Sequence, residues 1–271
     1  MSNFLKQMAD LSMVRAEHLP HKYDAIKLDR PSYDLQFSNF DIIAEYKANS
    51  PAEGSLVKKN FTKIERILAY INGGAAAISV LTEPTRFDGS LSDLVEIVDA
   101  VSHLSMPIMR KDFLVDPRQI MESKVSGASG ILLIAALFKP LQLRSMLDCA
   151  HEHSLFVLLE SFDSDDVIKS KSLLTESRYR AMTSQKKLLF GINTRDLKTL
   201  KVESQRLHLL ANEMPHEATL VAESGLHDVQ DILKARQDGY SMALIGTALM
   251  RANAPDKLIQ ELLLTGRSFG Q

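Results

Sequence analysis

Charged and amide side chains end most of the apolar runs of this 271-residue chain. Glu45 and Lys47 end the run that starts at Asp41, and Lys111 follows the run that starts at Pro107. Four more side chains of this kind end later runs: Glu160, Asn193, Arg195 and Glu223. Lysines and carboxylates brought close together must pair or shift their pKa values, and such clusters can transfer protons. These residue types therefore predict a site for acid–base chemistry.

The apolar runs themselves are the predicted strands that position these side chains. Eight runs occur, and each is almost continuously apolar, which is typical of parallel strands covered on both faces. The predicted strands are residues 41–46, 75–81, 107–110, 130–137, 156–160, 187–193, 219–223 and 241–246. Residues 45 and 47 are two apart, so their side chains are expected to point to the same side of the first strand, into the interior.

The order of the elements predicts the fold class. Amphipathic helical patterns separate the strands, and the strand ends recur at roughly the spacing of one βα unit. We predict a single (β/α)8 TIM barrel of the α/β class over residues 41–271, with an N-terminal helical extension, residues 1–40, packing on it. A doubly wound open sheet is the alternative, although six strands usually suffice for that fold. Barrel active sites lie at the carboxyl ends of the strands.

Two glycine-bearing turns follow the last two predicted strands. Ser224 and Gly225 precede one helical pattern, and Gly246 and Thr247 precede another. Glycine lets backbone N–H groups approach a ligand closely, and a helix N-terminus favours an anion. Loops at these two positions commonly bind phosphate in such barrels, whereas an ordinary chain reversal is the alternative for either turn alone. We expect a phosphate site here, over which the segment 50–54, beginning at Ser50, could close.

Composition excludes several classes of protein. The chain has 32 basic and 34 acidic residues, so it offers no strongly basic surface for nucleic acid. Its longest apolar run is about eight residues, too short to span a bilayer. The one cysteine, Cys149, allows no internal disulfide and fits a reducing cytoplasm. His151 and His153 fall on different faces of a helix, so no metal site is predicted.

Seven segments between Asp41 and Leu264 resemble one known family. They are AEYKANSPAEGSL, LTEPTRFDGSLSDL, PIMRKDFLVDPRQI, LLIAAL, GINTRDL, AESGL and LIGTALM. In this order they resemble the indole-3-glycerol phosphate synthases of tryptophan biosynthesis. The resemblance implies a carbon–carbon lyase (carboxy-lyase) that needs no metal or organic cofactor. Its substrate would be the phosphosugar-anthranilate 1-(2-carboxyphenylamino)-1-deoxyribulose 5-phosphate, which undergoes ring closure, decarboxylation and dehydration to indole-3-glycerol phosphate.

The resemblance also implies a role for each candidate residue. Lys111 matches the general acid, Glu160 the general base and Lys47 a second lysine of the site. Two neighbouring lysines should lower the pKa of one of them towards neutrality. The resemblance assigns the other positions as follows: Glu45 and Glu223 hold the lysines, Asn193, Arg195, Phe113 and Ser224 contact the substrate, and Ser50, Gly225, Gly246 and Thr247 bind its phosphate.

Two departures from the family pattern mark a divergent member. Phe162 stands where the family usually has histidine, and the stretch 163–185 is about ten residues longer than usual, which we interpret as a lengthened fifth helix or a surface loop. The alternatives are a different phosphosugar barrel, such as a phosphoribosylanthranilate isomerase relative, and a non-catalytic subunit that binds a phosphate ligand. We expect a monomer and an association with other tryptophan-pathway enzymes.

Overall fold

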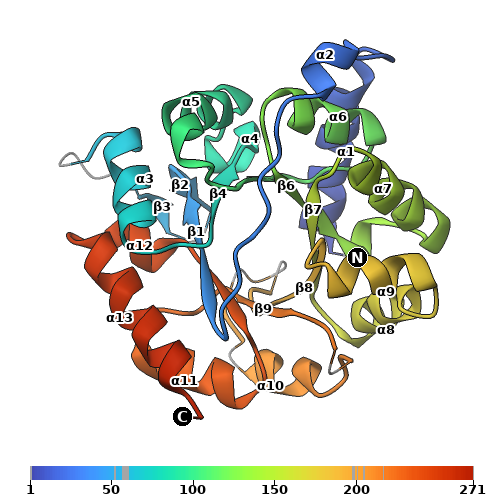
Figure 1. Ribbon diagram of the computed structural model, residues 1–271. Helices are drawn as coiled ribbons and strands as arrows, with labels where there is room; N and C mark the ends of the chain where they lie inside the picture. Colours follow the sequence, from blue (N-terminus) through green and yellow to red (C-terminus); the bar gives the residue numbers. More distant parts are fainter. Residues whose placement is uncertain are drawn as a thin grey trace.

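Eight parallel strands close into a barrel in the computed structural model, which describes residues 2–51, 53–56, 61–196, 199, 201–203, 205–215 and 217–270 (Figure 1). Ala52 of the expected closing segment and Gln271 lie outside the described residues. The strands are β1 (Asp41–Tyr46), β4 (Ala77–Leu81), β5 (Ile108–Lys111), β6 (Gly130–Ile134), β7 (Phe156–Ser161), β8 (Leu188–Asn193), β9 (Leu220–Glu223) and β10 (Met242–Ile245). The predicted (β/α)8 barrel is therefore confirmed, and the open-sheet alternative is wrong.

The first strand closes the barrel. β1 pairs with β4 on one side, where Glu45 lies opposite Ser79, and with β10 on the other, where Ala44 lies opposite Ile245. A short hairpin follows it, formed by β2 (Asn49–Ser50) and β3 (Gly54–Ser55). The hairpin therefore lies just beyond the carboxyl end of β1, at the end of the barrel where an active site is expected.

Helices cover the outside of the barrel (Figure 1). Pro117, Pro140 and Pro255 each occupy the first turn of a helix, as predicted from their missing N–H. The helices are α1 (Asn3–Glu17), α2 (Ala25–Leu28), α3 (Lys63–Asn72), α4 (Pro84–Phe87), α5 (Leu91–Val101), α6 (Pro117–Val125), α7 (Pro140–Glu152), α8 (Ser164–Leu173), α9 (Ser177–Ser184), α10 (Gln205–Ala211), α11 (Val229–Gln237), α12 (Thr247–Arg251) and α13 (Pro255–Ser268), with 3-10 turns at Ser102–Leu104 and Ala135–Leu137. Within the described residues no helix is long and apolar enough to cross a membrane.

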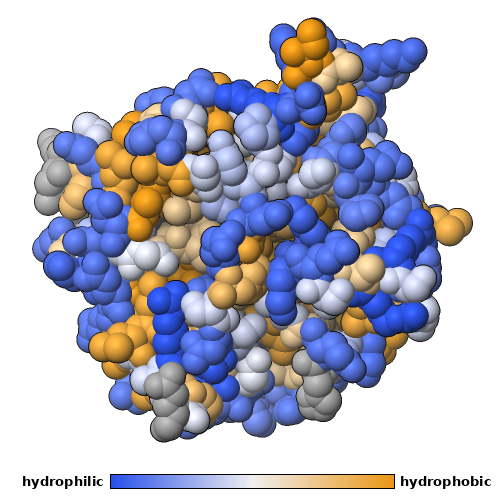
Figure 2. Space-filling view, viewed as in Figure 1, coloured by the Kyte–Doolittle hydropathy of each residue, from blue (hydrophilic) through white to orange (hydrophobic). Residues whose placement is uncertain are grey.

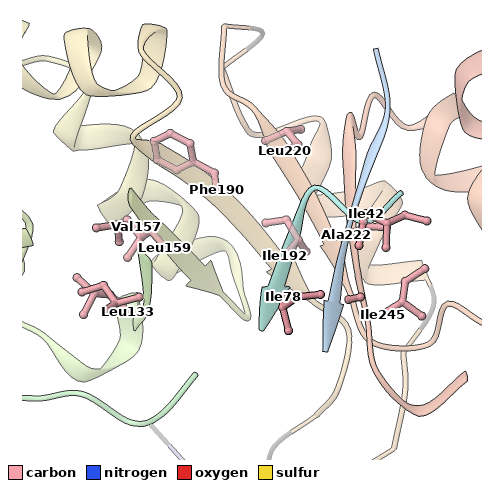
Figure 3. Packing of buried hydrophobic residues seen from close by; sticks show 14 of the residues in the cluster. Ile42, Ile78, Leu133, Val157, Leu159, Phe190, Ile192, Leu220, Ala222 and Ile245 are labelled. Atoms are coloured by element: carbon pink, nitrogen blue, oxygen red, sulfur yellow. The ribbon is translucent and has the colours of Figure 1, made fainter. Parts of the chain in front are cut away.

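Apolar side chains on both faces of the strands make two layers of core. One layer lies between the strands and the outer helices, and Figure 3 shows some of its members, among them Ile42, Val157 and Phe190. The other fills the barrel interior and includes Ile43, Leu158 and related residues from six further strands. Burial on both faces explains why each strand reads as a continuous apolar run.

The long stretch after β7 forms two helices rather than one lengthened helix or a loop. α8 ends at Leu173, and α9 begins at Ser177. Although the second stretch is rich in polar and basic residues, Tyr179 and Met182 are three apart and both are buried. The Tyr179 hydroxyl also donates to Asp148 of α7 at 3.0 Å. This pairing fixes α9 on the neighbouring helix.

The segment ahead of β1 contacts the barrel near both of its ends. Arg15 of α1 forms an ion pair with Asp112, which follows the carboxyl end of β5. Further along, the Tyr33 N–H donates to Ser129, which precedes β6, and Leu35 joins the interior core. Between these contacts α2 projects from the barrel, and Figure 2 shows apolar side chains on this projection at the top of the view.

Candidate active site

The two-residue period of the strands places the predicted polar groups above the interior core. Side chains two positions apart on a strand share a face. Four strands carry an apolar interior residue followed, two positions later, by an ionisable one. The pairs are Ile43 and Glu45, Met109 and Lys111, Leu158 and Glu160, and Val221 and Glu223. The same geometry that packs the interior therefore brings these charges together at its carboxyl end.

One pocket of about 1030 Å³, part of it open to solvent, contains every predicted site residue. Its lining includes the charged and amide residues Glu45, Lys47, Lys111, Glu160, Asn193, Arg195 and Glu223. It also includes Phe113, Ser224 and the four expected phosphate contacts Ser50, Gly225, Gly246 and Thr247. Side chains and turns from six strands, and from positions up to about 200 residues apart in the chain, thus share one cavity.

A lysine between carboxylates forms the centre of the pocket. The Lys111 Nζ atom lies 3.2 Å from Glu160 Oε2 and 3.5 Å from Glu223 Oε2. A second pair stands beside it, in which Lys47 Nζ lies 2.9 Å from Glu45 Oε1. The three carboxylates are almost fully buried. This arrangement can hold, donate and accept protons away from bulk water.

The carboxylates control the charge on Lys111. Burial opposes its positive charge, but Glu160, Glu223 and Glu45 outweigh burial and raise the pKa of Lys111 above its ordinary value. The pKa of Lys111 thus moves in the direction opposite to the lowering expected for one of the two lysines, because three carboxylates act on its ammonium. Burial likewise works against ionisation of Glu45, and the neighbouring Lys47 and Lys111 overcome it to lower the pKa of Glu45.

The surroundings of Glu223 favour its protonated form. Burial, followed by the neighbouring Glu160, raises the pKa of Glu223 well above its ordinary value. Neither of its oxygens has a hydrogen-bond partner among the described residues. The side chain lies over Gly191 of β8, where an added Cβ would come within 2.0 Å of Glu223 Oε1. Gly191, which the sequence analysis missed, is thus needed to make room for this carboxyl.

Gly246 likewise makes room for the pair formed by Glu45 and Lys47. A Cβ at this position would lie 2.3 Å from Glu45 Oε1 and 3.1 Å from Lys47 Nζ. The glycine therefore lets the backbone after β10 approach the Glu45–Lys47 pair closely. Its role as an expected phosphate contact is compatible with this position, since the same turn presents Thr247 to the pocket.

The other glycine turn adopts an unusual backbone conformation. Ser224 and Gly225 both have positive φ, of 67° and 74°. The sequence analysis expected the following helix to offer its N-terminus to an anion. Instead α11 begins at Val229, and the Asp228 side chain accepts hydrogen bonds from the N–H groups of Gln230 and Asp231 at the start of that helix. The turn itself, rather than that helix end, therefore faces the pocket.

Aromatic side chains also line the pocket. The Phe113 ring contacts Phe4 edge to face, with centroids 6.2 Å apart, and lies 6.3 Å from the Phe87 ring. Phe162 also lines the pocket, and its N–H donates to Asp166 Oδ2 at 3.1 Å. Such a wall suits the flat ring of an aromatic ligand.

The sequence analysis missed Phe4 and Phe87 as pocket residues. Phe4 lies on α1 and Phe87 ends α4, so each reaches Phe113 from a distant part of the chain. No local pattern marks such contacts, since residue spacing reports only neighbours along one element. Motif LTEPTRFDGSLSDL contains Phe87, but the motif alone does not show where that ring points.

An ion pair holds α1 at the rim of the pocket. Arg15 Nη2 lies 2.6 Å from Asp112 Oδ1, and Arg15 Nη1 lies 3.6 Å from Glu83 Oε1. Asp112 is also bound by Arg110 at 3.1 Å and by the Thr82 hydroxyl at 2.9 Å. Asp112, which follows Lys111 in the chain, is thus part of a buried network of ion pairs and hydrogen bonds that extends to α1.

Comparison with known proteins identifies the family. A family model described as indole-3-glycerol phosphate synthase matches residues 36–262. The chain belongs to the indole-3-glycerol phosphate synthase family. It is 37% identical to the enzyme of Koribacter versatilis over 248 residues, 92% of this chain and 87% of that protein. The enzyme of Methanopyrus kandleri is 39% identical over 230 residues, 84% of each chain. These matches confirm the resemblance seen in the sequence.

Solved structures agree on the fold. Phosphoribosylanthranilate isomerase from Thermotoga maritima superposes with a TM-score of 0.55, covering 85% of this chain and all of that one. The two sequences are only 11% identical, so the likeness shows the barrel and nothing more. It gives no support to the isomerase alternative raised by the sequence.

Proposed function

We propose that the chain acts as a carboxy-lyase on 1-(2-carboxyphenylamino)-1-deoxyribulose 5-phosphate and forms indole-3-glycerol phosphate. The aromatic ring attacks the sugar carbonyl, carbon dioxide leaves the ring, and the hydroxyl formed in the attack leaves as water. The placement of Lys111 between Glu160 and Glu223 at 3.2 and 3.5 Å carries this proposal. Membership of the family supports it.

Lys111 is proposed as the general acid. Attack on the carbonyl develops negative charge on oxygen, and an ammonium in a buried site can protonate it and stabilise that charge. Because the carboxylates raise its pKa, Lys111 carries its proton at neutral pH. Glu160, paired with the same ammonium, is the proposed base that takes the proton lost from the newly closed five-membered ring when the hydroxyl leaves as water.

The remaining polar groups are proposed to position the two lysines and the substrate. Glu45 holds Lys47 at 2.9 Å, and Glu223 faces Lys111. Asn193 accepts from the Arg195 N–H at 2.9 Å and so orders the loop that carries this guanidinium, which suits a carboxylate or phosphate. The proposed phosphate contacts are Ser50, Gly225, Gly246 and Thr247, with Ser224 beside them.

The aromatic wall is proposed to take the carboxyphenyl ring. Phe113 contacts Phe4 and lies near Phe87, and all three rings line the same pocket as the lysines. With the ring packed there, the sugar and the phosphate would extend towards the turns that carry the proposed phosphate contacts. We further propose a monomeric, cytoplasmic enzyme that needs no metal or organic cofactor and associates with other enzymes of the tryptophan pathway.

Two substrates and one binding measurement separate the proposal from its alternatives. The purified chain is given the carboxyphenylamino substrate and, separately, phosphoribosylanthranilate, while calorimetry measures binding of each. We expect turnover of the first substrate only. Turnover of the second instead would favour the isomerase alternative, and tight binding without turnover of either would favour a non-catalytic subunit.

A further inference from the structure

The tip of the hairpin after β1 places a carboxylate on the candidate phosphate contacts. Glu53 Oε1 accepts from the Thr247 hydroxyl at 3.1 Å and lies 3.6 Å from Arg195 Nη2. Its second oxygen, Oε2, lies 3.0 Å from Arg251 Nη2. Two guanidinium groups and one hydroxyl, from the loop after β8 and from helix α12, therefore converge on one anion supplied by the hairpin.

The hairpin that carries Glu53 is anchored at its base. The Leu56 N–H donates to the Ala48 carbonyl at 2.9 Å, and Leu56 is buried. The Asn49 amide donates to Asp88 Oδ2 at 2.7 Å. Towards the tip, the Glu53 N–H donates to the Ser50 carbonyl at 3.1 Å. The side chain of Glu53 thus reaches two pocket residues, Thr247 and Arg195, from a fixed stem.

The charges at this place favour a stronger anion than a carboxylate. Glu53 offers one negative charge and two oxygens to this cluster of two guanidinium groups and one hydroxyl. A phosphate dianion carries a second negative charge and offers more acceptor oxygens for bidentate guanidinium contacts. It would also be repelled by Glu53 if the carboxylate stayed within a few ångströms of it.

We propose that Glu53 is a specificity-determining residue that occupies the phosphate subsite, and that a phosphate dianion exchanges with its carboxylate at Thr247, Arg195 and Arg251. This inference rests on the proposed function, because the phosphate that exchanges with Glu53 is the phosphate group of the proposed substrate. It goes further by assigning Arg251 as a phosphate ligand and Glu53 as its internal competitor. Ligands that lack the second negative charge displace Glu53 less readily, so the subsite selects for phosphate.

Occupation of the subsite by Glu53 lowers the apparent affinity for phosphate. When only a fraction of molecules has the subsite open, the apparent dissociation constant rises by the inverse of that fraction. Glu53→Gln keeps the shape and an acceptor oxygen for Thr247 but removes the charge. It should therefore bind phosphate more tightly than the unchanged protein does.

Calorimetric titration of the full chain with inorganic phosphate tests this directly, and it needs no turnover. We expect Glu53→Gln to bind phosphate about three- to thirty-fold more tightly than the unchanged protein, and Arg251→Gln to bind it several-fold more weakly. Glu203→Gln is the matched control, because Glu203 is an exposed carboxylate that pairs with Arg206. It removes the same charge and should leave phosphate binding unchanged.

The results distinguish exchange of Glu53 with phosphate from a purely structural role of Glu53 in holding the hairpin. If Glu53 only fastens the hairpin, Glu53→Gln will bind phosphate equally well or more weakly, and the proposal is overturned. An equal gain in Glu203→Gln would overturn it too, since the effect would then be general electrostatics. Unchanged binding in Arg251→Gln would remove that residue from the subsite. Because the titration is independent of activity, a chain without turnover that still shows the expected pattern would refute the proposed reaction but not the exchange.

Discussion

At the scale of residues, two lysines and three buried glutamates form the chemical centre of the molecule. Lys111 contacts Glu160 and Glu223, and Glu45 lies close enough to raise its pKa further. An uncompensated charge in such a place would be costly, so each group depends on the others. Substitutions here are expected to change catalysis and stability together.

Replacing Lys111 tests its proposed role as the acid. Lys111→Met removes both the proton and the positive charge, so we expect turnover to fall about 10³-fold or more. Lys111→Arg keeps the charge but is a poor proton donor, and it should lose most of the activity as well. Steady-state kinetics with circular dichroism as a check on folding measures both. An unchanged turnover number in Lys111→Met would refute the assignment.

Glu223 predicts a pH dependence of stability. Between the ordinary carboxyl pKa of 4.5 and the raised value, the folded state holds a proton that the unfolded state has released. Protonated Glu223 thus stabilises the fold at low pH, and the free energy of unfolding falls as the pH rises through this window, by about 1.4 kcal/mol per unit. Glu223→Gln mimics the protonated form and should make the protein about 1–3 kcal/mol more stable at pH 8.

Urea unfolding at pH 6 and pH 8 measures the effect of Glu223→Gln. The exposed Glu203→Gln is the control, and its pH dependence should equal that of the unchanged protein. If the free energy of unfolding of Glu223→Gln still falls between pH 6 and pH 8 as much as that of the unchanged protein, protonation of Glu223 is not the cause of the fall.

At the scale of elements, α1 completes a pocket whose other walls come from the barrel. Arg15 fixes the helix to Asp112, and Phe4 on the same helix contacts Phe113. The helix therefore contacts Asp112 and Phe113, the two residues that directly follow Lys111 in the chain. Loss of this link should affect binding more than the chemical step.

Arg15→Met is expected to raise the KM for substrate several-fold and to change kcat less, because Phe4 would no longer be held at the aromatic wall. Asp112 keeps Arg110 as a partner, so the loss of unfolding free energy should be only about 1–2 kcal/mol. Steady-state kinetics and urea unfolding measure the two effects. Lys6→Met, on an exposed position of the same helix, is the control, and an equal change in KM there would contradict the proposed link.

The elements show where sequence reasoning succeeds and where it fails. All eight strands could be predicted, because parallel strands buried on both faces are continuous apolar runs, most of which end in charged or amide residues. α9 was not separated from α8, since its buried Tyr179 and Met182 lie among many polar residues. The charges of the pocket were found because strand ends meet at one edge. Phe4 lines the pocket, and Arg15 and Glu53 contact residues that line it, through long-range contacts that no local spacing encodes.

At the scale of the whole molecule, one barrel brings together groups that are scattered along the chain. The net charge of −2 gives no sign of a site, yet the barrel gathers two lysines and three glutamates at one end of its interior. The apolar core beneath them keeps water away, and the extension covers part of the mouth. The fold thus turns an ordinary composition into a cluster of coupled charges, which is what the proposed ring closure requires.

Formation of product from the carboxyphenylamino substrate tests the central claim most directly. The purified chain is incubated with 1-(2-carboxyphenylamino)-1-deoxyribulose 5-phosphate at several pH values from about 5 to 9, and indole fluorescence and released carbon dioxide are followed together. The account predicts that both signals rise in equal amounts and that Lys111→Met abolishes them. No fluorescence above that of buffer at any of these pH values would contradict the account.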